Sequence, residues 1–168
     1  MRVHAERRAE QRGQTIIEFA LITPFLLLFI FIIVDLGLGL SRWINVTNAA
    51  REGARFGAVG HTKDEIICRT IAKSEGLLGD SDTCTVDTDH ADIKVNWADE
   101  NGNGMLGDGG DSVMVQVEYD YSILTPIDSI LKLFGGGGIS GTLPLKSCAD
   151  MRLDAGATTD GRDDIECD

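Results

Sequence analysis

A loop of Asp, Asn and Gly is the stretch whose residue types and spacing could bind a ligand. It reads DENGNGMLGDGGD from Asp99 to Asp111. Asp99, Asn101 and Asn103 stand at alternate positions and Gly104 follows, as in the first half of an EF-hand calcium loop. Carboxylate and amide oxygens with this spacing can converge on one cation, because the glycine permits a sharp turn.

The second half of this loop departs from the EF-hand pattern. Position 12 is Gly110 instead of Glu, so Asp108 or Asp111 would have to supply the closing carboxylate. No helix pair is predicted on the two sides of the loop. Two interpretations stay open, a metal-free turn-rich loop or a structural Ca²⁺ site with Asp99, Asn101, Asn103, Asp108 and Asp111 as ligands.

Catalytic patterns are not evident elsewhere in the sequence. No serine stands in a nucleophile elbow, and we expect no catalytic partner beside the three scattered histidines, His4, His61 and His90. The glycine run at 135–138 lacks the Lys-Ser/Thr of a phosphate-binding loop and is typical of a flexible connection. We therefore expect no enzymatic activity, and no cofactor apart from the calcium ion considered above.

Four cysteines lie in the C-terminal two thirds of the chain, at Cys68, Cys84, Cys148 and Cys167. No two of them have the Cys-x2-Cys spacing of a zinc site. An even number of cysteines in an oxidising compartment indicates two disulfides, with three connectivities open. The pairs Cys68–Cys84 and Cys148–Cys167 close the shortest loops, and we favour them.

A long uncharged apolar run precedes the loop and the cysteines described above. No charged residue lies between Glu18 and Asp35, and the run from Ile16 to Leu40 would be about 37 Å long as a helix. A bilayer core requires about 20 apolar residues, so this run is long enough to cross a membrane once. A cleavable signal peptide would be shorter and would end at a small-residue cleavage site, and no Ala-x-Ala follows this run directly.

The flanks of the run predict its orientation. Residues 1–13 carry four arginines and two glutamates, and residues 61–168 carry 22 Asp and Glu against 8 Lys and Arg, a net charge of −14. Short arginine-rich flanks stay in the cytoplasm, so the C-terminal part is expected outside it, in a single-pass inner-membrane topology. A domain this acidic is not expected to bind nucleic acid.

Two residues are unusual for a simple membrane anchor. Glu18 lies near the start of the apolar run. A carboxylate inside a membrane without a partner costs about several kcal/mol of free energy. Pro24 lies inside it and deprives the Ala20 carbonyl of its helical donor, for which neighbouring helices or the Thr23 hydroxyl can partly compensate. Glu18 therefore either has a function or extends to the interface and meets water there.

The segment resembles a known family at this point. Gly13 followed by QTIIE resembles the processing site of type IV prepilins, and GQTIIEFALITPFLLLFIFIIVDLG followed by NAAREGARFGAV at 48–59 is similar to the TadE-like pseudopilins of Tad (Flp) pilus systems. The matching features are the Glu-Phe-Ala, the internal proline, the acidic residue near the end of the run, and the Ala-Ala-Arg-Glu-Gly-Ala-Arg block. The resemblance extends over about residues 12–60.

The resemblance implies a maturation step and a set of partners. It implies that a membrane prepilin peptidase cuts between Gly13 and Gln14, and that Glu18 helps to register the subunit against one already assembled. The cut would remove the four leader arginines and create an α-amino group four residues before Glu18. The implied partners are the peptidase, the membrane, and other pilin or pseudopilin subunits that contact the N-terminal helix.

The remaining sequence predicts a small α+β domain carried by a long helix. The helix should continue through 41–59, where alanines and glycines recur every four residues and favour close packing, either with other helices or with the chain's own domain. Thr62 and Glu65 have capping-box spacing before a helix over 63–75. The inward positions of an expected half-buried antiparallel strand at 113–119 are Val113, Val115, Val117 and Tyr119, which alternate with Met114, Gln116 and Glu118. Further pieces are expected as strands at 84–86, 93–97, 142–145 and 147–153, and as a helix at 126–134.

These elements give four expected regions: a leader at 1–13, a transmembrane and extended helix at 14–60, an extracytoplasmic α+β domain at 61–154, and an acidic, loose tail at 155–168. The functional hypothesis that follows is a minor pseudopilin in Tad pilus biogenesis or adhesion. A membrane-anchored binding module, with or without calcium, is the alternative from another class. A major pilin that forms the shaft is a third alternative, disfavoured by the large outer domain because Tad-type major pilins are very short.

Overall fold

The computed structural model describes residues 3–125, 132, 135, 141–154, 156, 159, 163, 165 and 167, and for residues 3–13 the backbone alone. The chain divides into two units, Met1–Leu38 and Gly39–Asp168. Each unit is described by itself. The predicted helix at 126–134 lies almost entirely outside the described residues.

Helix α1 runs without a break from Val3 to Gly57, through the internal Pro24. In the first unit its apolar side chains are mostly exposed, with Phe19, Leu21 and Leu36 each more than two-thirds exposed. In the second unit the same helix carries a buried stripe of small residues, and Ala49, Ala50 and Ala54 are fully buried. The small side chains predicted at 41–59 therefore pack against the chain's own domain.

Helix α2, Lys63–Lys73, follows after a short turn. The predicted capping box is present, because the Thr62 amide and hydroxyl both donate to Glu65 Oε2 at 3.0 Å. The helix ends two residues before the predicted position at 75. Ser74 caps it by donating its amide to the Ile71 carbonyl at 3.0 Å, and Glu75 has a φ of 56°, which stops helical propagation.

The described part of the chain has five strands: β1 Gly79–Asp80, β2 Thr85–Val86, β3 Ala91–Ala98, β4 Ser112–Ser122 and β5 Thr142–Arg152. The first two form a small hairpin, and the others form an antiparallel sheet in the order β3-β4-β5. The last strand expected around 142–145 and 147–153 is β5, which pairs with β4 along its whole length and includes Lys146. The predicted α+β class with an antiparallel sheet is confirmed.

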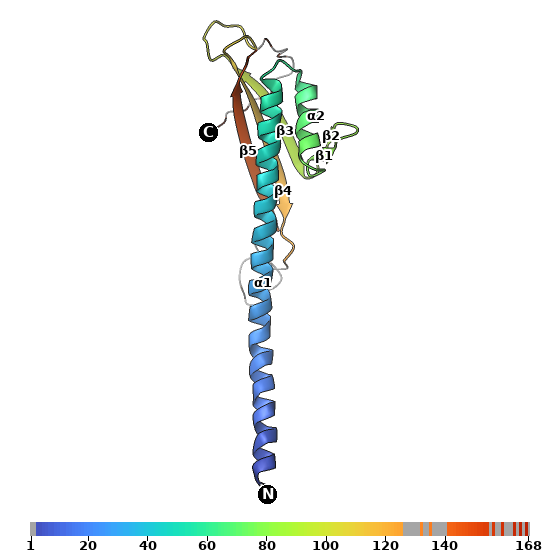
Figure 1. Cartoon of the computed structure of the whole chain (residues 1–168), viewed down its shortest axis with the longest axis vertical. Helices are drawn as coiled ribbons and strands as arrows, with labels where there is room; N and C mark the ends of the chain where they lie inside the picture. Colours follow the sequence, from blue (N-terminus) through green and yellow to red (C-terminus); the bar gives the residue numbers. More distant parts are fainter. Residues whose placement is uncertain are drawn as a thin grey trace. The chain divides into compact units, whose positions relative to one another are not determined.

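The core of the second unit lies between the sheet and the two helices, which share one face of it (Figure 1). Val113, Val115 and Val117 of β4 are fully buried, which confirms the predicted alternation. Two glycines of α1 allow the close approach. A Cβ on Gly53 would stand 2.2 Å from Thr70 Oγ1, and one on Gly57 would stand 2.9 Å from the Ile66 side chain. At these two glycines the backbone of α1 therefore packs directly against side chains of α2 and β4.

The C-terminal segment is not loose at the positions described. Asp163 and Val95 of β3 exchange two hydrogen bonds of 2.9 Å, one through the Asp163 carboxylate and one through its amide. The other carboxylate oxygen pairs with Lys63 Nζ at 2.9 Å, and Ile165 is buried. The expectation of a loose tail is wrong here because these residues cover the outer edge of β3, which would otherwise expose unpaired backbone groups.

Candidate functional site

The residues of the expected processing site form part of one helix. Gly13, Gln14 and Glu18 all lie within α1, so the uncut chain is helical across the bond in question. Gln14 Nε2 donates to Glu18 Oε1 at 3.4 Å, and the Glu18 side chain is exposed. The side chain at position 14 therefore sits one helical turn from the carboxylate, as the residue spacing implies.

Beyond Glu18 the helix presents an apolar surface on every side. The large exposed side chains there are Phe19, Leu21, Ile22, Phe25, Leu26, Leu27, Phe29, Ile30, Phe31, Ile32, Ile33 and Val34. By length and composition Gln14–Gly57 is a helix that can cross a membrane, with a mean hydropathy of 2.7 in its most apolar window. An apolar surface of this extent requires lipid or other proteins around it.

The helix adapts to Pro24 differently from the sequence-based expectation. The Thr23 hydroxyl donates to the Phe19 carbonyl at 2.7 Å, four residues back. It does not bond to the Ala20 carbonyl, which is the one that loses its donor at Pro24. Thr23 is therefore satisfied locally, as hydroxyls in apolar helices commonly are.

An ionic cluster joins the two helices of the second unit. Glu52 accepts two hydrogen bonds from Arg55, three positions further along α1, each of 3.0 Å. It also accepts from Arg69 of α2 at 2.6 and 3.1 Å. These hydrogen bonds, from Arg55 first and Arg69 second, lower the pKa of Glu52 from 4.5 to about 2. Arg69 could not be predicted, because no local spacing relates it to Glu52.

Phe56 and His61 continue this cluster. Arg69 lies over the Phe56 ring, 5.7 Å from its centre, and the ring stacks on His61 with 3.6 Å between centres. The His61 ring in turn contacts Glu65 at 3.2 Å. Every charge in the cluster has a partner, so the arrangement positions α2 on α1 and offers no reactive group.

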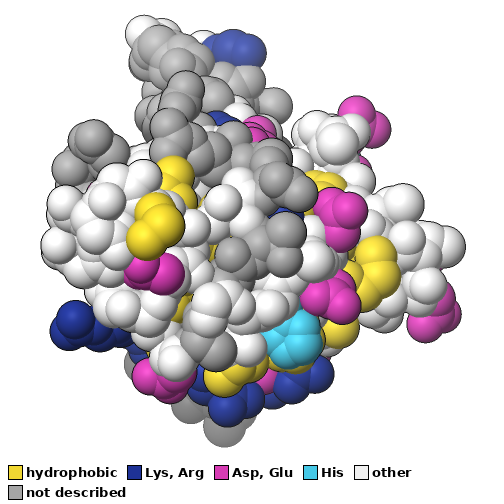
Figure 2. Space-filling view, turned by 90° about the horizontal axis from the view of Figure 1, so that it is seen from above, with side chains coloured by type: hydrophobic (Ala, Val, Ile, Leu, Met, Phe, Trp, Pro, Cys, Tyr) yellow, Lys and Arg dark blue, Asp and Glu magenta, His cyan; other side chains and the backbone are white. Residues whose placement is uncertain are grey.

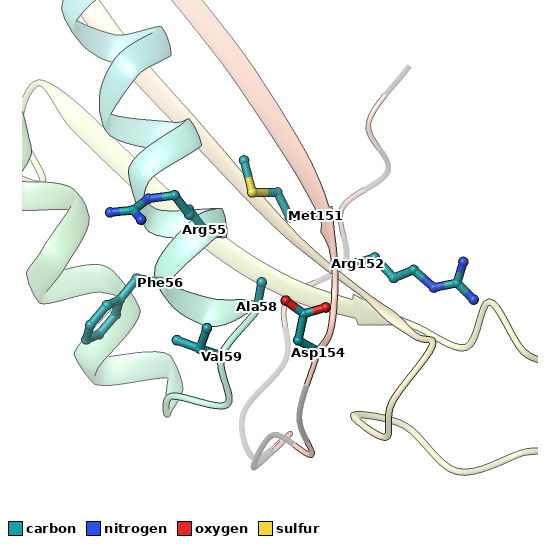
Figure 3. Close-up of a pocket in the computed structure, with 7 residues that line it drawn as sticks. All are labelled: Arg55, Phe56, Ala58, Val59, Met151, Arg152 and Asp154. Carbon is teal, nitrogen blue, oxygen red and sulfur yellow. The ribbon is translucent and has the colours of Figure 1, made fainter.

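A shallow hollow of about 440 Å³ lies beside this cluster, between the end of α1 and the end of β5. Figure 3 shows that the guanidinium groups of Arg55 and Arg152 point in opposite directions, away from each other. Asp154 is held at its rim because its amide donates to the Ala58 carbonyl at 2.9 Å. The lining contains no nucleophile and no converging charges.

The loop between β3 and β4 is folded around the side chains predicted as metal ligands. Asp99 Oδ1 accepts from the Gly102 amide at 2.6 Å, and Oδ2 accepts from the Gly104 amide at 2.8 Å. Asn101 and Asn103 each donate an amide N–H to a different oxygen of Asp108, both at 2.5 Å. Gly104 has a φ of 80°, the sharp turn that the sequence predicted.

Asp111 stands apart from the other four predicted ligands. Its side chain is fully buried, and its Oδ2 caps the neighbouring turn by accepting from the amides of Gly107 at 2.8 Å and Asp108 at 3.2 Å. Its Oδ1 has no hydrogen-bond partner among the residues that the structure describes. Within the described residues, no group of three or more His, Cys, Asp and Glu side chains is arranged to hold a metal ion. The loop thus brings together two carboxylates and two amides.

The structure contains two disulfides, so the prediction of disulfide bonding is confirmed. They join Cys68 to Cys84 and Cys148 to Cys167, the pairs with the shortest loops. The first fastens the β1–β2 hairpin to α2, and the second fastens the C-terminal segment to β5. The described part of the chain has no free cysteine.

Acidic side chains do not gather in one patch on the face seen in Figure 2. They lie at several separate places across it, with Lys and Arg side chains along the lower edge and others near the top. Several of the acids have basic partners, among them Glu118, whose pKa is lowered chiefly by its hydrogen bond from Lys146. The acidity therefore gives a solvated surface, with no visible site for a polyanion.

In the described residues, an apolar helix long enough to cross a membrane precedes a small disulfide-bonded α+β domain, an arrangement that fits a membrane-anchored, pilin-like subunit. Residues 13–55 match the model of the family described as TadE-like protein, which confirms the resemblance over that part of the chain. This family is structural and non-enzymatic, and the match indicates a component related to the Tad pilus. No curated protein and no solved structure matches the chain.

Proposed function

We propose that this chain is a minor pseudopilin of a Tad-type pilus machine, with a role in pilus biogenesis or adhesion. A prepilin peptidase cuts it between Gly13 and Gln14 after insertion with the N-terminus in the cytoplasm. The mature helix then leaves the lipid to join other pilin or pseudopilin helices. The domain outside the cytoplasm contacts further subunits, and the protein performs no chemistry of its own.

One observation carries this proposal. The apolar surface from Phe19 to Val34 is exposed within the chain, and it begins directly after the short stretch from Gly13 to Glu18 that the family match includes. A surface that the chain's own domain leaves open can be covered by lipid at first and by neighbouring helices later. A purely soluble role would leave it in water, which is unfavourable.

The role of Glu18 follows from its cost in an apolar environment. A carboxylate there needs a cation or a hydrogen-bond donor close by. In the uncut chain the nearby donor is the Gln14 amide group at 3.4 Å. The cut turns Gln14 into a new N-terminus, and its charged α-amino group can pair with Glu18 of the same helix or of a neighbouring subunit. Processing thus couples the removal of the leader to a new electrostatic contact.

Substitution of Gly13 tests the cut. Gly13→Leu should leave the chain unprocessed, so its mass in membranes of the native host should retain residues 1–13, and pili should be absent. The control is Gly37→Leu, in the same helix but outside the proposed site, which should be processed normally. Normal pili built with an uncut Gly13→Leu chain would overturn the proposal and favour a simple anchor.

Substitution of Glu18 tests docking separately. Glu18→Gln keeps the shape but loses the charge, so the chain should be cut normally and yet assemble poorly. Its control is Glu10→Gln, which alters an acid inside the leader. Unchanged assembly of Glu18→Gln would exclude the docking role while leaving the processing proposal intact.

A second candidate function, a calcium-dependent binding module, is favoured by the loop after β3. Asp99, Asn101 and Asn103 each accept a backbone N–H from further along the loop, as the first half of a calcium loop does. Asp99 Oδ1 accepts a second amide, that of Asn103. The oxygens of Asn101 and Asn103, and Asp99 Oδ2, which accepts from the Gly104 amide, each retain a second lone pair for a cation. Asp108 lies against both asparagines and is the carboxylate that can close the site.

Thermal unfolding of the full chain in detergent tests this candidate. Addition of Ca²⁺ should raise the Tm, EGTA should reverse the rise, and Mg²⁺ should have a smaller effect. Asp99→Ala should abolish the rise, whereas Asp89→Ala, an exposed acid on another loop, should retain it. A Tm that does not respond to Ca²⁺ would identify a metal-free turn.

A further inference from the structure

Large exposed apolar side chains in the second unit gather towards one end of it. Among the described residues from Gly39 onwards, five of the seven belong to the start of its helix or to the β4–β5 end. The other two, Val59 and Met105, belong to the end of α1 and to the β3–β4 loop. The five at the first end are Leu40, Trp43, Ile44, Leu124 and Leu143.

Contacts along α1 show why these side chains lie at the same end of the second unit. A Cβ on Gly57 would touch Val113 and one on Gly53 would touch Val115, whereas one on Gly39 would lie 3.6 Å from the Tyr121 ring. Strand β4 therefore runs antiparallel to the helix. The spacing agrees, because fourteen helical residues and six strand residues each span about 20 Å.

The same contacts fix the β4–β5 end near the expected bilayer boundary. Gly39 lies inside the apolar run that ends at Leu40, and the exposed Trp43 follows within about one helical turn. Tyr121 packs beside Gly39 and pairs across the sheet with Leu143. Strand β4 ends at Ser122, and Leu124, two residues further along the chain, has an exposed fraction of 71%.

We propose that this end of the domain, formed by Leu124 and Leu143 together with Leu40 and Trp43, rests in the outer interface of the lipid bilayer. The occupant is lipid because this surface includes Leu40, the residue at which the apolar run of the sequence ends. Leucine and aromatic side chains at this level, with Arg42 beside them, have the composition of an interfacial contact. The domain would thus have a second membrane contact besides its helix, which must be released when the subunit enters a filament.

This inference rests on the proposed membrane anchoring, and single tryptophan reporters in the full chain can separate the two. In a Trp43→Phe background the remaining Trp97 is buried and constant. Leu124→Trp places a reporter at the proposed contact, and Met105→Trp places a matched exposed reporter on the β3–β4 loop. Each chain is reconstituted in phosphatidylcholine nanodiscs at one chain per disc, with or without a shallow doxyl-labelled lipid.

The expected result is lipid quenching of the Leu124→Trp reporter that exceeds that of the Met105→Trp reporter by about twofold or more, with blue-shifted emission, as for an interfacial ring. Iodide in the water should show the opposite order. Equal iodide quenching of both reporters would overturn the contact while the chain stays anchored. Protection that arises only at several chains per disc would also overturn it, because a second copy would then cover this end. Failure of the chain to enter nanodiscs would instead count against the anchor itself.

Discussion

The two parts of helix α1 differ in the size and the exposure of their side chains. From Phe19 to Val34 its large side chains are exposed, whereas between Val46 and Ala58 its buried positions are occupied mainly by small residues packed against β4 and α2 (Figure 1). The first part thus carries bulk that its own chain does not cover. The second lacks bulk because a sheet and a helix must approach it closely.

Glycines make the same contrast at single positions. A Cβ on Gly37 would meet nothing within 4 Å, whereas one on Gly53 would meet Thr70 Oγ1 at 2.2 Å. The same residue type in one helix is therefore free of steric constraint in one part and required by packing in the other. Stability of the domain should depend on the second part, and assembly should depend on the first.

Loss of a disulfide should give the largest change in the stability of the domain that packs on the second part of α1. The double change Cys68→Ser with Cys84→Ser opens a loop of 16 residues and should cost about 3 kcal/mol of unfolding free energy, because the unfolded chain gains entropy. Denaturant unfolding of the full chain in detergent, followed by fluorescence, measures it.

The paired change Cys148→Ser with Cys167→Ser opens a loop of similar size and serves as the comparison. It should cost about as much on the same chain-entropy argument. A midpoint unchanged in both variants would mean that the domain does not depend on its covalent links.

Substitution of Gly53 should have the next largest effect. Gly53→Val should lower the unfolding free energy by about 2 kcal/mol or more, because the new side chain must displace Thr70 and the nearby Val115. Gly37→Val is the matched control in the first part of the helix, where the space is open. Its melting temperature in detergent should match that of the unaltered protein, and an equal loss in both variants would refute the contrast between the two parts.

Acid sensitivity should give a smaller effect, confined to the second part. The pKa of Glu52 is lowered from 4.5 to about 2, so the ionised form is stabilised in the folded state. This contribution is fully present above pH 4.5 and is lost as the pH falls towards 2. Its size is about 1–2 kcal/mol for a side chain that retains 15% exposure.

Glu52→Gln should therefore lower stability at pH 7 and flatten the loss of stability between pH 4.5 and 2. Unfolding midpoints measured across this range provide the test. Glu75→Gln, at the end of α2, should retain the full acid dependence. A variant at position 52 with the same pH profile as the unaltered chain would show that Arg55 and Arg69 do not act through this carboxylate.

Local sequence signals were sufficient for several features. The length and apolarity of the run from Ile16 to Leu40 indicate a spanning helix, and the alternation of Val113, Val115 and Val117 indicates a half-buried strand. The capping box at Thr62 and Glu65 depends on residues only three positions apart. Each of these features arises from neighbours in sequence, so the sequence by itself determined them.

Tertiary structure decided what lies far apart in the chain. Arg69 reaches Glu52 across 17 positions, and Asp163 reaches Val95 across 68, and no periodicity relates either pair. The tertiary structure likewise brought Asp108 against Asn101 and Asn103 and turned Asp111 to a different role. These contacts depend on how strands and helices pack, because burial and close approach select partners that spacing along the chain does not specify.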